Sequence, residues 1–407
     1  MYETGVSVRF VAMIRSILAP FVLLTASLVA APVFIGTSSK DKGIYLADFD
    51  SATGRLTEPT LAAEYQNPGF LAKHPTKPIL YAVGQPKKPF ADGTSSLAAF
   101  SIGADHSLKF LGEVSTGGKG ACHLAVDATG RTVAIANYGD GHISTVRLDE
   151  NGLPGEVVSM IANKGSGPNK SRQEGPHAHG VYFDKANKHL FVPDLGLDQV
   201  FVYPFDAASS KLGEPLPSLA TAPGAGPRHL AFSPDEKFAY VIDELDQTVT
   251  VAGHESGTGK FTTLAVAPTL PGDFTAANKT SEIEVHPNGK FVYASNRGHD
   301  SIAVYSIAQD GKLTLLQHML GTPAMPRGFG LSADGRWLVC AGQKSGTLNA
   351  YRIGRDGKLT DTKQSVEAPA AAAITPAAAA PPVPAATAAP MPRSNCSAKS
   401  VARKSRQ

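Results

Sequence analysis

One segment of the chain carries a cation, an imidazole and two carboxylates at the ends of a predicted hairpin. Arg228 and His229 open the segment, and Asp243 and Glu244 close it. Between them lie two apolar strands, residues 230–232 and 238–242, joined by a Ser-Pro-Asp turn. Antiparallel pairing brings the two ends of a hairpin to the same edge of a sheet. We therefore expect Arg228 and Glu244 to lie at one edge.

Polar strand ends of the same kind recur elsewhere in the chain. The motif Gly175-Pro-His-Ala-His179 precedes a strand, Arg297 ends one, and Pro326-Arg327 opens another. Three arginines, two imidazoles and one carboxylate suit a site that binds an anion and moves a proton. The candidate catalytic residues are Glu244, His177, Arg228 and Arg297, and the candidate substrate-binding residues are His179, His229 and Arg327.

The residue types suggest a role for each candidate. A guanidinium group matches a forked oxyanion better than an ammonium group does, so Arg228 and Arg297 would hold a phosphate or carboxylate and the developing oxyanion. Either Glu244 or His177 would activate water. Each residue also has a structural interpretation: Glu244 could simply pair with a neighbouring arginine, the histidines could cap turns, and the arginines could join neighbouring sheets.

Other catalytic signatures are absent from the sequence. It has no Gly-x-Ser-x-Gly elbow, no phosphate-binding Gly-Lys-Ser/Thr loop and no His-Glu-x-x-His motif. The three cysteines lack metal-ligand spacing. We expect neither a metal nor a cofactor.

A repeat predicts how these residues are positioned. A pair of short strands occurs seven times: residues 34–37 with 43–49, 80–83 with 97–100, 133–137 with 143–146, 190–193 with 200–203, 238–242 with 248–251, 291–294 with 302–305, and 337–340 with 348–351. Each pair is followed by a further strand, and all but the first are preceded by one. Four strands per unit of roughly fifty residues indicate an all-β, seven-bladed propeller of four-stranded antiparallel blades. Its topology would gather the candidate residues at one mouth of the central channel.

The two ends of the chain differ from the repeats. Residues 1–31 place Arg9 and Arg15 before an apolar run, which is typical of a signal peptide or an N-terminal anchor. We assign residues 32–367 to the propeller and residues 368–407, rich in Ala and Pro and then basic, to a disordered tail. Residues 370–375 are the one candidate for a strand that closes the ring, and alanine is a weak β former.

The formal net charge of +3 comes from the two basic ends, because the body between them is mildly acidic. This balance gives no argument for binding nucleic acid. We expect a monomer without a stable membrane span beyond the N-terminal segment.

The motifs resemble those of the lactonase family of seven-bladed propellers, which includes bacterial 6-phosphogluconolactonases and the carboxymuconate cyclases. The resemblance covers residues 33–364 and is strongest at Gly175-Pro-His-Ala-His179, Gly226-Pro-Arg-His229, Asp243-Glu-Leu245, Ser295-Asn-Arg-Gly298 and Pro326-Arg-Gly-Phe329. It implies that His177, Arg228, Glu244 and Arg297 match the site that the family uses. Asp243 stands where the family more usually has Asn.

This resemblance implies a lactonase of carbohydrate metabolism that hydrolyses an anionic sugar lactone, such as 6-phosphoglucono-1,5-lactone. Two alternatives stay open: a cyclase that forms a lactone from a carboxylated muconate, and an exported propeller that binds a ligand without turnover. The N-terminal segment predicts export to the periplasm or the medium. A mis-assigned start codon would instead leave the protein in the cytoplasm, where sugar phosphates occur.

Overall fold

The computed structural model describes residue 1 and residues 31–375, and every regular element in them is a β-strand. The strands form seven small antiparallel sheets that stand around one axis as the blades of a propeller. The predicted seven-bladed, all-β fold is confirmed. No helix in this part of the chain is long and apolar enough to cross a membrane.

The blades are numbered along the chain. Blade 1 holds β1 (Ala31–Thr37), β2 (Ile44–Asp50), β3 (Arg55–Leu56), β4 (Thr60–Ala63) and the last strand, β30 (Ala371–Thr375). Blade 2 holds β5 (Gln66–Lys73), β6 (Ile79–Gln85), β7 (Ser96–Ile102) and β8 (Leu108–Ser115). Blade 3 holds β9 (Ala121–Val126), β10 (Thr132–Asn137), β11 (His142–Leu148) and β12 (Pro154–Ala162).

Blade 4 holds β13 (Tyr182–Phe183), β14 (His189–Asp194), β15 (Gln199–Asp206), β16 (Lys211–Leu212) and β17 (Leu216–Ala220). Blade 5 holds β18 (Pro227–Phe232), β19 (Phe238–Asp243), β20 (Thr248–Glu255) and β21 (Lys260–Pro268). Blade 6 holds β22 (Lys279–Val285), β23 (Phe291–Arg297), β24 (Ser301–Ile307) and β25 (Leu313–Leu320). Blade 7 holds β26 (Pro326–Leu331), β27 (Trp337–Gly342), β28 (Thr347–Ile353) and β29 (Leu359–Glu367).

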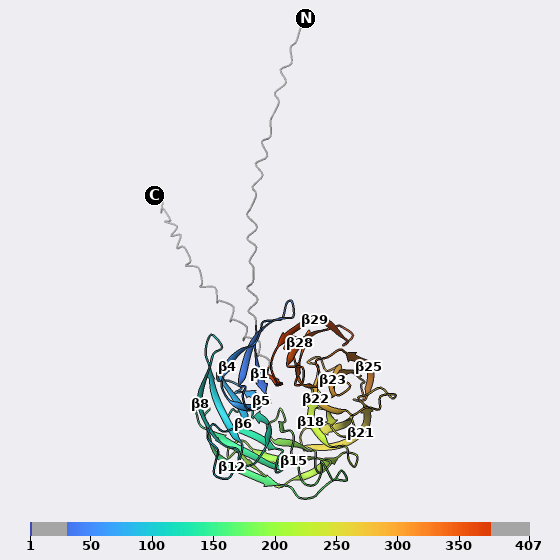
Figure 1. Cartoon of the computed structure of the whole chain (residues 1–407). Coiled ribbons are helices and arrows are strands. Elements are labelled where there is room, and N and C mark those ends of the chain that lie inside the picture. The colour runs from blue at the N-terminus through green and yellow to red at the C-terminus, as the bar shows by residue number, and fades with distance from the viewer. Residues whose placement is uncertain (2–30, 376–407) are drawn as a thin grey trace, which may run out of the picture.

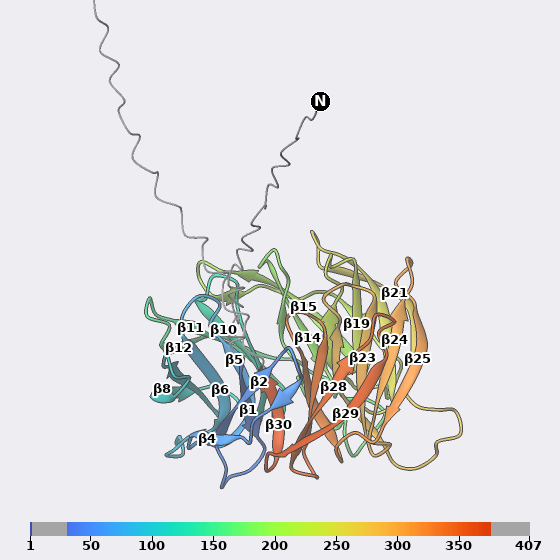
Figure 2. The same ribbon diagram turned by 90° about the horizontal axis from the view of Figure 1, so that it is seen from above.

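In blades 2 to 7 the strands run outward from the axis in chain order, whereas in blade 1 the last strand, β30, lies inside β1. Figure 1 shows β1, β5, β18 and β22 toward the centre of the ring and β8, β12, β21, β25 and β29 at its rim. Figure 2 shows the same blades from the side. The starts of the innermost strands and the ends of the second strands therefore share one face of the ring, which we call the mouth.

The chain closes its own ring with β30, which pairs antiparallel with β1 and opposes Ile374 to Ile35 and Ala373 to Gly36. The propeller thus extends to Thr375, and the boundary expected after residue 367 is wrong. Ala371, Ala372 and Ala373 are buried, and the main chain of β30 packs so closely on blade 7 that a Cβ on Gly328 would come within 2.5 Å of the Ala372 carbonyl oxygen. Close packing of the inner strands decides this segment, rather than intrinsic β propensity.

Apolar side chains fill the spaces between neighbouring blades. The interface between blades 1 and 7 joins Ile35 and Phe49 to Trp337 and also contains Ala371 of the closing strand. Buried tyrosines add hydrogen bonds across such interfaces, since the Tyr240 hydroxyl donates to the carbonyl of Gly311 at 3.2 Å. Gly311 has φ +83°, and a Cβ there would meet the Phe238 ring at 2.3 Å. Apolar packing and hydrogen bonds therefore both join neighbouring blades.

Both expected terminal segments fall largely outside the described residues. The signal or anchor was assigned to residues 1–31, of which residues 2–30 are not described, and residue 31 opens β1. Residues 376–407 of the expected disordered tail are also not described.

Candidate active site

Second strands in four consecutive blades have Asn or Asp at or next to their last residue, and the residue that follows lies at the mouth. These pairs are Asn137-Tyr138, Asp194-Leu195, Asp243-Glu244 and Asn296-Arg297. The amide of Asn137 donates to the carbonyl of His142 at 3.2 Å and to the hydroxyl of Ser144 at 3.1 Å. Each Asn or Asp thus fixes the turn that carries the functional residue.

In blade 5 the carboxyl group of Asp243 fixes the turn that follows the second strand. Its Oδ2 accepts from the hydroxyls of Thr250 at 2.7 Å and Thr248 at 3.1 Å, and the side chain is fully buried. Burial, and then the nearby Asp246, raises the pKa of Asp243 well above its ordinary value. A neutral carboxylic acid is close in shape and polarity to an amide, which explains how Asp stands where relatives more usually have Asn.

Glu244 lies at the centre of the mouth and is only 3% exposed. Its backbone N–H donates to the carbonyl of Gly226 at 2.7 Å, which ties the end of β19 to the start of β18. Arg228 Nε is 3.2 Å from Glu244 Oε2, as an ion pair without an aligned hydrogen bond. The two ends of the predicted hairpin therefore meet, as the sequence indicated.

Two further arginines complete a cluster that we call the arginine clamp: Arg172, Arg228 and Arg297 around Glu244. Arg297 Nη2 donates to Glu244 Oε2 at 2.9 Å, and Arg172 Nη2 donates to Oε1 at 2.8 Å. Arg297 also donates to the carbonyl of Thr280 at 2.7 Å, and Arg228 donates to that of Ser281 at 2.7 Å. Blades 5 and 6 thus fix two of the guanidinium groups directly.

Burial by itself would raise the pKa of Glu244. The charges of Arg297 and Arg228, then His179 and the hydrogen bond from Arg172, outweigh burial and hold that pKa well below its ordinary value. A carboxylate so strongly stabilised is a weak base at neutral pH. Its geometry fits the task of orienting three arginines better than that of taking a proton from water.

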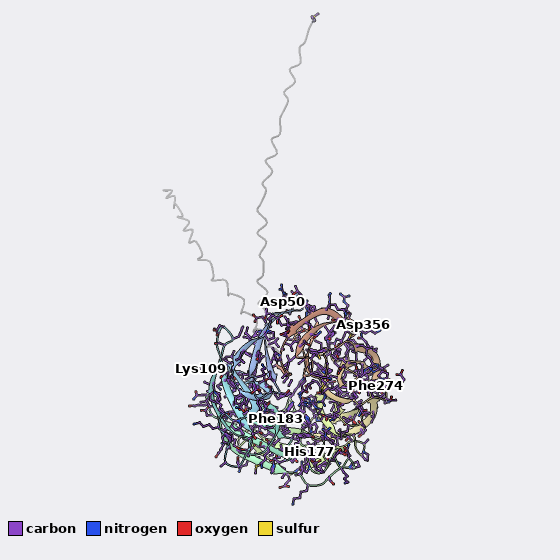
Figure 3. The ribbon with its side chains drawn as sticks, viewed as in Figure 1. Asp50, Lys109, His177, Phe183, Phe274 and Asp356 are labelled. Atoms are coloured by element: carbon purple, nitrogen blue, oxygen red, sulfur yellow. The ribbon has the colours of Figure 1, made fainter. Side chains whose placement is uncertain are left out.

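His177 has the geometry of a general base. Its backbone N–H donates to Asp194 Oδ1 at 2.8 Å, and its ring stacks on the Tyr138 ring with the centroids 4.5 Å apart. Ring Nδ1 lies 2.8 Å from the Tyr138 carbonyl oxygen, which can only accept, so Nδ1 carries the proton. Ring Nε2 lies 3.2 Å from Glu174 Oε1, a largely exposed carboxylate that can only accept, so Glu174 must turn away before Nε2 can take a proton from water. Figure 3 labels His177 in the same sector of the ring as Phe183 of blade 4.

The two other candidate histidines line the channel below the mouth. His179 Nε2 is 4.0 Å from Glu244 Oε2, and burial together with Arg228 and His229 pushes the pKa of His179 well below its usual range. His229 lies under Arg228, and its Nδ1 is 2.7 Å from Glu282 Oε1. Burial raises the pKa of Glu282 to about 7. Both imidazoles therefore contact the clamp from below.

Arg327 of β26 is a channel cation whose side chain has no hydrogen bond or ion pair among the described residues. Burial, and then the charge of Arg228, lowers the pKa of Arg327 to about 10, so it stays charged at neutral pH. An unneutralised, largely desolvated cation is well suited to bind an anionic group of a ligand.

Sequence reasoning missed Arg172, which lies in the loop between β12 and β13. The loop is folded around Gln173, whose amide donates to the carbonyl of Leu195 at 2.9 Å and to Asp198 Oδ1 at 2.7 Å. Arg172 also donates to the Tyr138 hydroxyl at 3.1 Å. The loop has no strand periodicity, and its one available signal was its position just before the Gly175-Pro-His motif. Within residues 31–375 no group of three metal-ligating side chains is close enough to hold an ion.

Comparison with known proteins identifies the family of the chain. Residues 32–376 match the family model described as "Lactonase, 7-bladed beta-propeller". A Bacillus subtilis 6-phosphogluconolactonase is 35% identical over 320 residues, which cover 77% of this chain and 89% of that protein. A 6-phosphogluconolactonase of Formosa agariphila is 30% identical over 329 residues, covering 79% and 92%. The solved periplasmic gluconolactonase of Pseudomonas aeruginosa superimposes with a TM-score of 0.79 at 27% identity, covering 86% and 99%.

The fold and the mouth thus define a β-propeller enzyme of the lactone-hydrolysing class. The chain belongs to the lactonase family of seven-bladed β-propellers.

Proposed function

We propose that this protein hydrolyses the ester bond of an anionic sugar lactone at the mouth of its channel. The observation that carries the proposal is the arginine clamp beside His177. Three guanidinium groups are fixed by one carboxylate, and the His177 imidazole stacks on Tyr138, the hydroxyl of which accepts from Arg172 of the clamp. The relatives named as 6-phosphogluconolactonases and as a gluconolactonase support a lactone as the substrate.

Hydrolysis requires one proton to move twice. His177 Nε2 takes a proton from water as the water oxygen bonds to the lactone carbonyl carbon. The bond between that carbon and the ring oxygen then breaks, and the ring oxygen takes the proton from His177. The products are the open-chain acid and the regenerated imidazole.

The clamp would stabilise the negative charge that develops on the carbonyl oxygen. Each clamp arginine has one buried N–H without a hydrogen-bond partner among the described residues: Arg172 Nη1, Arg228 Nε and Arg297 Nε. Donors that are already desolvated and oriented stabilise an oxyanion without reorganisation. Arg327 would bind the phosphate or carboxylate of the substrate.

An assay of the purified protein tests this function. It should hydrolyse 6-phosphoglucono-1,5-lactone or glucono-1,5-lactone faster than the spontaneous reaction, and His177→Gln should abolish the difference. Turnover of a carboxylated muconate alone would identify a cyclase. Binding of these compounds without turnover of any would identify a binding module.

We also propose that the protein is exported and acts as a monomer in the periplasm. Arg9 and Arg15 before an apolar run support export, and the P. aeruginosa neighbour is a periplasmic enzyme. Cell fractionation, with a variant lacking residues 2–30 as the control, should find the full-length chain outside the cytoplasm. Full-length chain in the cytoplasm would reject export and favour the phosphorylated lactone. Light scattering on the purified protein would test the monomer.

A further inference from the structure

A cleft that is separate from the arginine clamp opens on the mouth between blades 2 and 3. It has a volume of about 500 Å³ and is bordered by the start of β5, the end of β6 and the start of β9. These strand ends lie on the same face as Glu244. The backbone N–H of Tyr138 donates to the carbonyl of Gly120, a lining residue, at 3.0 Å. The cleft therefore adjoins the residue on which the His177 ring stacks.

The lining of the cleft is uncharged and contains several amide side chains that are available for hydrogen bonds. Gln66, Asn67 and Gln85 line it, and their side chains make no hydrogen bond with any residue that the structure describes. Each amide offers two donors and an acceptor. Phe90 is half-buried at the same cleft and has no ring partner in residues 31–375. No charged side chain lines the space.

The backbone holds this cleft open. The pairing of β5 with β6 shifts register between Gln66 and Phe70, and Asn67 has φ +48°. Such bulges redirect side chains and are frequent beside active sites. A Cβ on Gly84 would come within 2.6 Å of the Gln66 carbonyl oxygen, so this part of the wall must be glycine. The shape is built by main chain and does not depend on flexible side chains.

The loop that carries Phe90 is also fixed. Gly93 N–H donates to the Phe90 carbonyl at 3.0 Å, and Thr94 bonds Asp92 through both its N–H, at 3.0 Å, and its hydroxyl, at 2.8 Å. The main chain that carries Phe90 is thus fixed at the cleft before any ligand binds, which lowers the entropy lost on binding.

An aromatic face together with free amides and no charge matches a neutral, polyhydroxylated ring. We propose that this cleft binds a further sugar unit, so that the lactone hydrolysed at the mouth, with or without an anionic group for Arg327, is part of an oligosaccharide whose reducing-end sugar has been oxidised. The proposal rests on the proposed function, because the cleft holds the part of the substrate that does not react. A class of sugar oxidase or dehydrogenase acting on oligosaccharides would supply such a lactone.

The first test compares two substrates that share the reacting ring. We expect kcat/KM for cellobiono-1,5-lactone or maltobiono-1,5-lactone to exceed that for glucono-1,5-lactone by about tenfold or more. Phe90→Ala should remove most of this preference and leave kcat/KM for glucono-1,5-lactone within about twofold. Phe274→Ala is the matched control: it removes a half-buried aromatic ring from the other side of the ring of blades (Figure 3) and should leave the preference unchanged. Equal kcat/KM values for the mono- and disaccharide lactones would overturn the proposed sugar-binding cleft. A fall of kcat/KM for both lactones in Phe90→Ala would overturn it as well.

A binding measurement separates failure of the subsite from failure of the proposed function. Calorimetry with cellobionate or maltobionate and with gluconate should show tighter binding of the disaccharide acid, and Phe90→Ala and Gln85→Ala should weaken only that binding. This result would uphold the cleft even if no lactone were hydrolysed. Disaccharide acids that bind no better than gluconate would overturn the proposal even if glucono-1,5-lactone were a good substrate.

Discussion

Arg172 and Glu244 are 72 residues apart in the chain, yet Arg172 Nη2 donates to Glu244 Oε1 at 2.8 Å. This contact brings the loop after blade 3 over the end of the second strand of blade 5. It leaves Oε2 of the same carboxylate to Arg228 and Arg297. Both carboxylate oxygens are therefore used by cations, and Glu244 serves the site as a fixed counter-charge.

Glu244→Gln should lower stability as well as activity. The substitution keeps the shape but removes the charge that compensates three buried guanidinium groups. Breaking a buried ion cluster in this way costs about 3–5 kcal/mol. We expect a clear fall in Tm, and a fall in kcat/KM because the arginines lose their orientation. Unchanged Tm with lost turnover in the folded fraction would instead identify Glu244 as the base.

His177→Gln should give the opposite pattern. The amide can keep the hydrogen bond to the Tyr138 carbonyl but cannot accept a proton from water. We expect kcat to fall roughly 10²- to 10⁴-fold with little change in Tm or in KM. A variant that keeps the turnover rate of the parent protein would show that another group accepts the proton.

Arg327→Ala and Arg297→Ala should separate substrate binding from stability. Arg327 has no partner among the described residues, so its loss should raise KM for an anionic lactone by roughly 10- to 100-fold and leave Tm unchanged or higher. Arg297 bonds both Glu244 and Thr280, so its loss should lower Tm and kcat/KM together. Equal destabilisation by the two substitutions would contradict a ligand-binding role for Arg327.

The sequence predicted best what depends on local pairing. Arg228 and Glu244 flank one hairpin, and antiparallel pairing alone brings them together whatever the rest of the chain does. Likewise the seven strand pairs could be predicted from the sequence because strand composition and turn residues recur in each. By contrast, Arg172 reaches Glu244 from a loop shaped by the buried contacts of Gln173, and no periodic pattern encodes such a loop.

The role of Glu244 and the presence of the closing strand were harder to predict from the sequence for a second reason. A carboxylate at a site mouth suggests a base, and only the positions of three cations show that its pKa is held down. Alanines at 371–373 suggest a tail, and only the pairing with β1 and the burial of these residues show that they form the closing strand. In both cases the environment of the residue decides, and that environment comes from distant parts of the chain.

Ring closure by β30 can be tested by truncation. A chain ending after residue 376 keeps the strand, whereas one ending after residue 369 removes it and uncovers the edge of β1. We expect the longer chain to match the Tm of the full protein and the shorter one to unfold at a lower temperature or to aggregate through the free edge. As a single substitution, Ala371→Asp places a charge in the core between blades 1 and 7 and should act like the shorter truncation. Equal Tm values for the two truncated chains would show that the ring does not need the strand.

Asp243→Asn should stabilise the protein at neutral and alkaline pH. Because burial and Asp246 raise the pKa of Asp243 in the folded state, folding favours the protonated form. The stability that this group contributes is present below the pKa of the unfolded chain and is lost as pH rises through the folded-state pKa. An amide stays neutral and can bond the hydroxyls of Thr248 and Thr250, as Asn137 bonds Ser144 in blade 3.

Thermal unfolding at several pH values measures this effect. The variant should match the parent protein at pH 4 and exceed its Tm at pH 8, while the exposed control Asp273→Asn should follow the parent throughout. Because Asp243 positions Glu244 through the backbone, activity at pH 8 should be kept. A lower Tm at pH 8 would mean that the ionised carboxylate, and not the neutral acid, is the form that the fold requires.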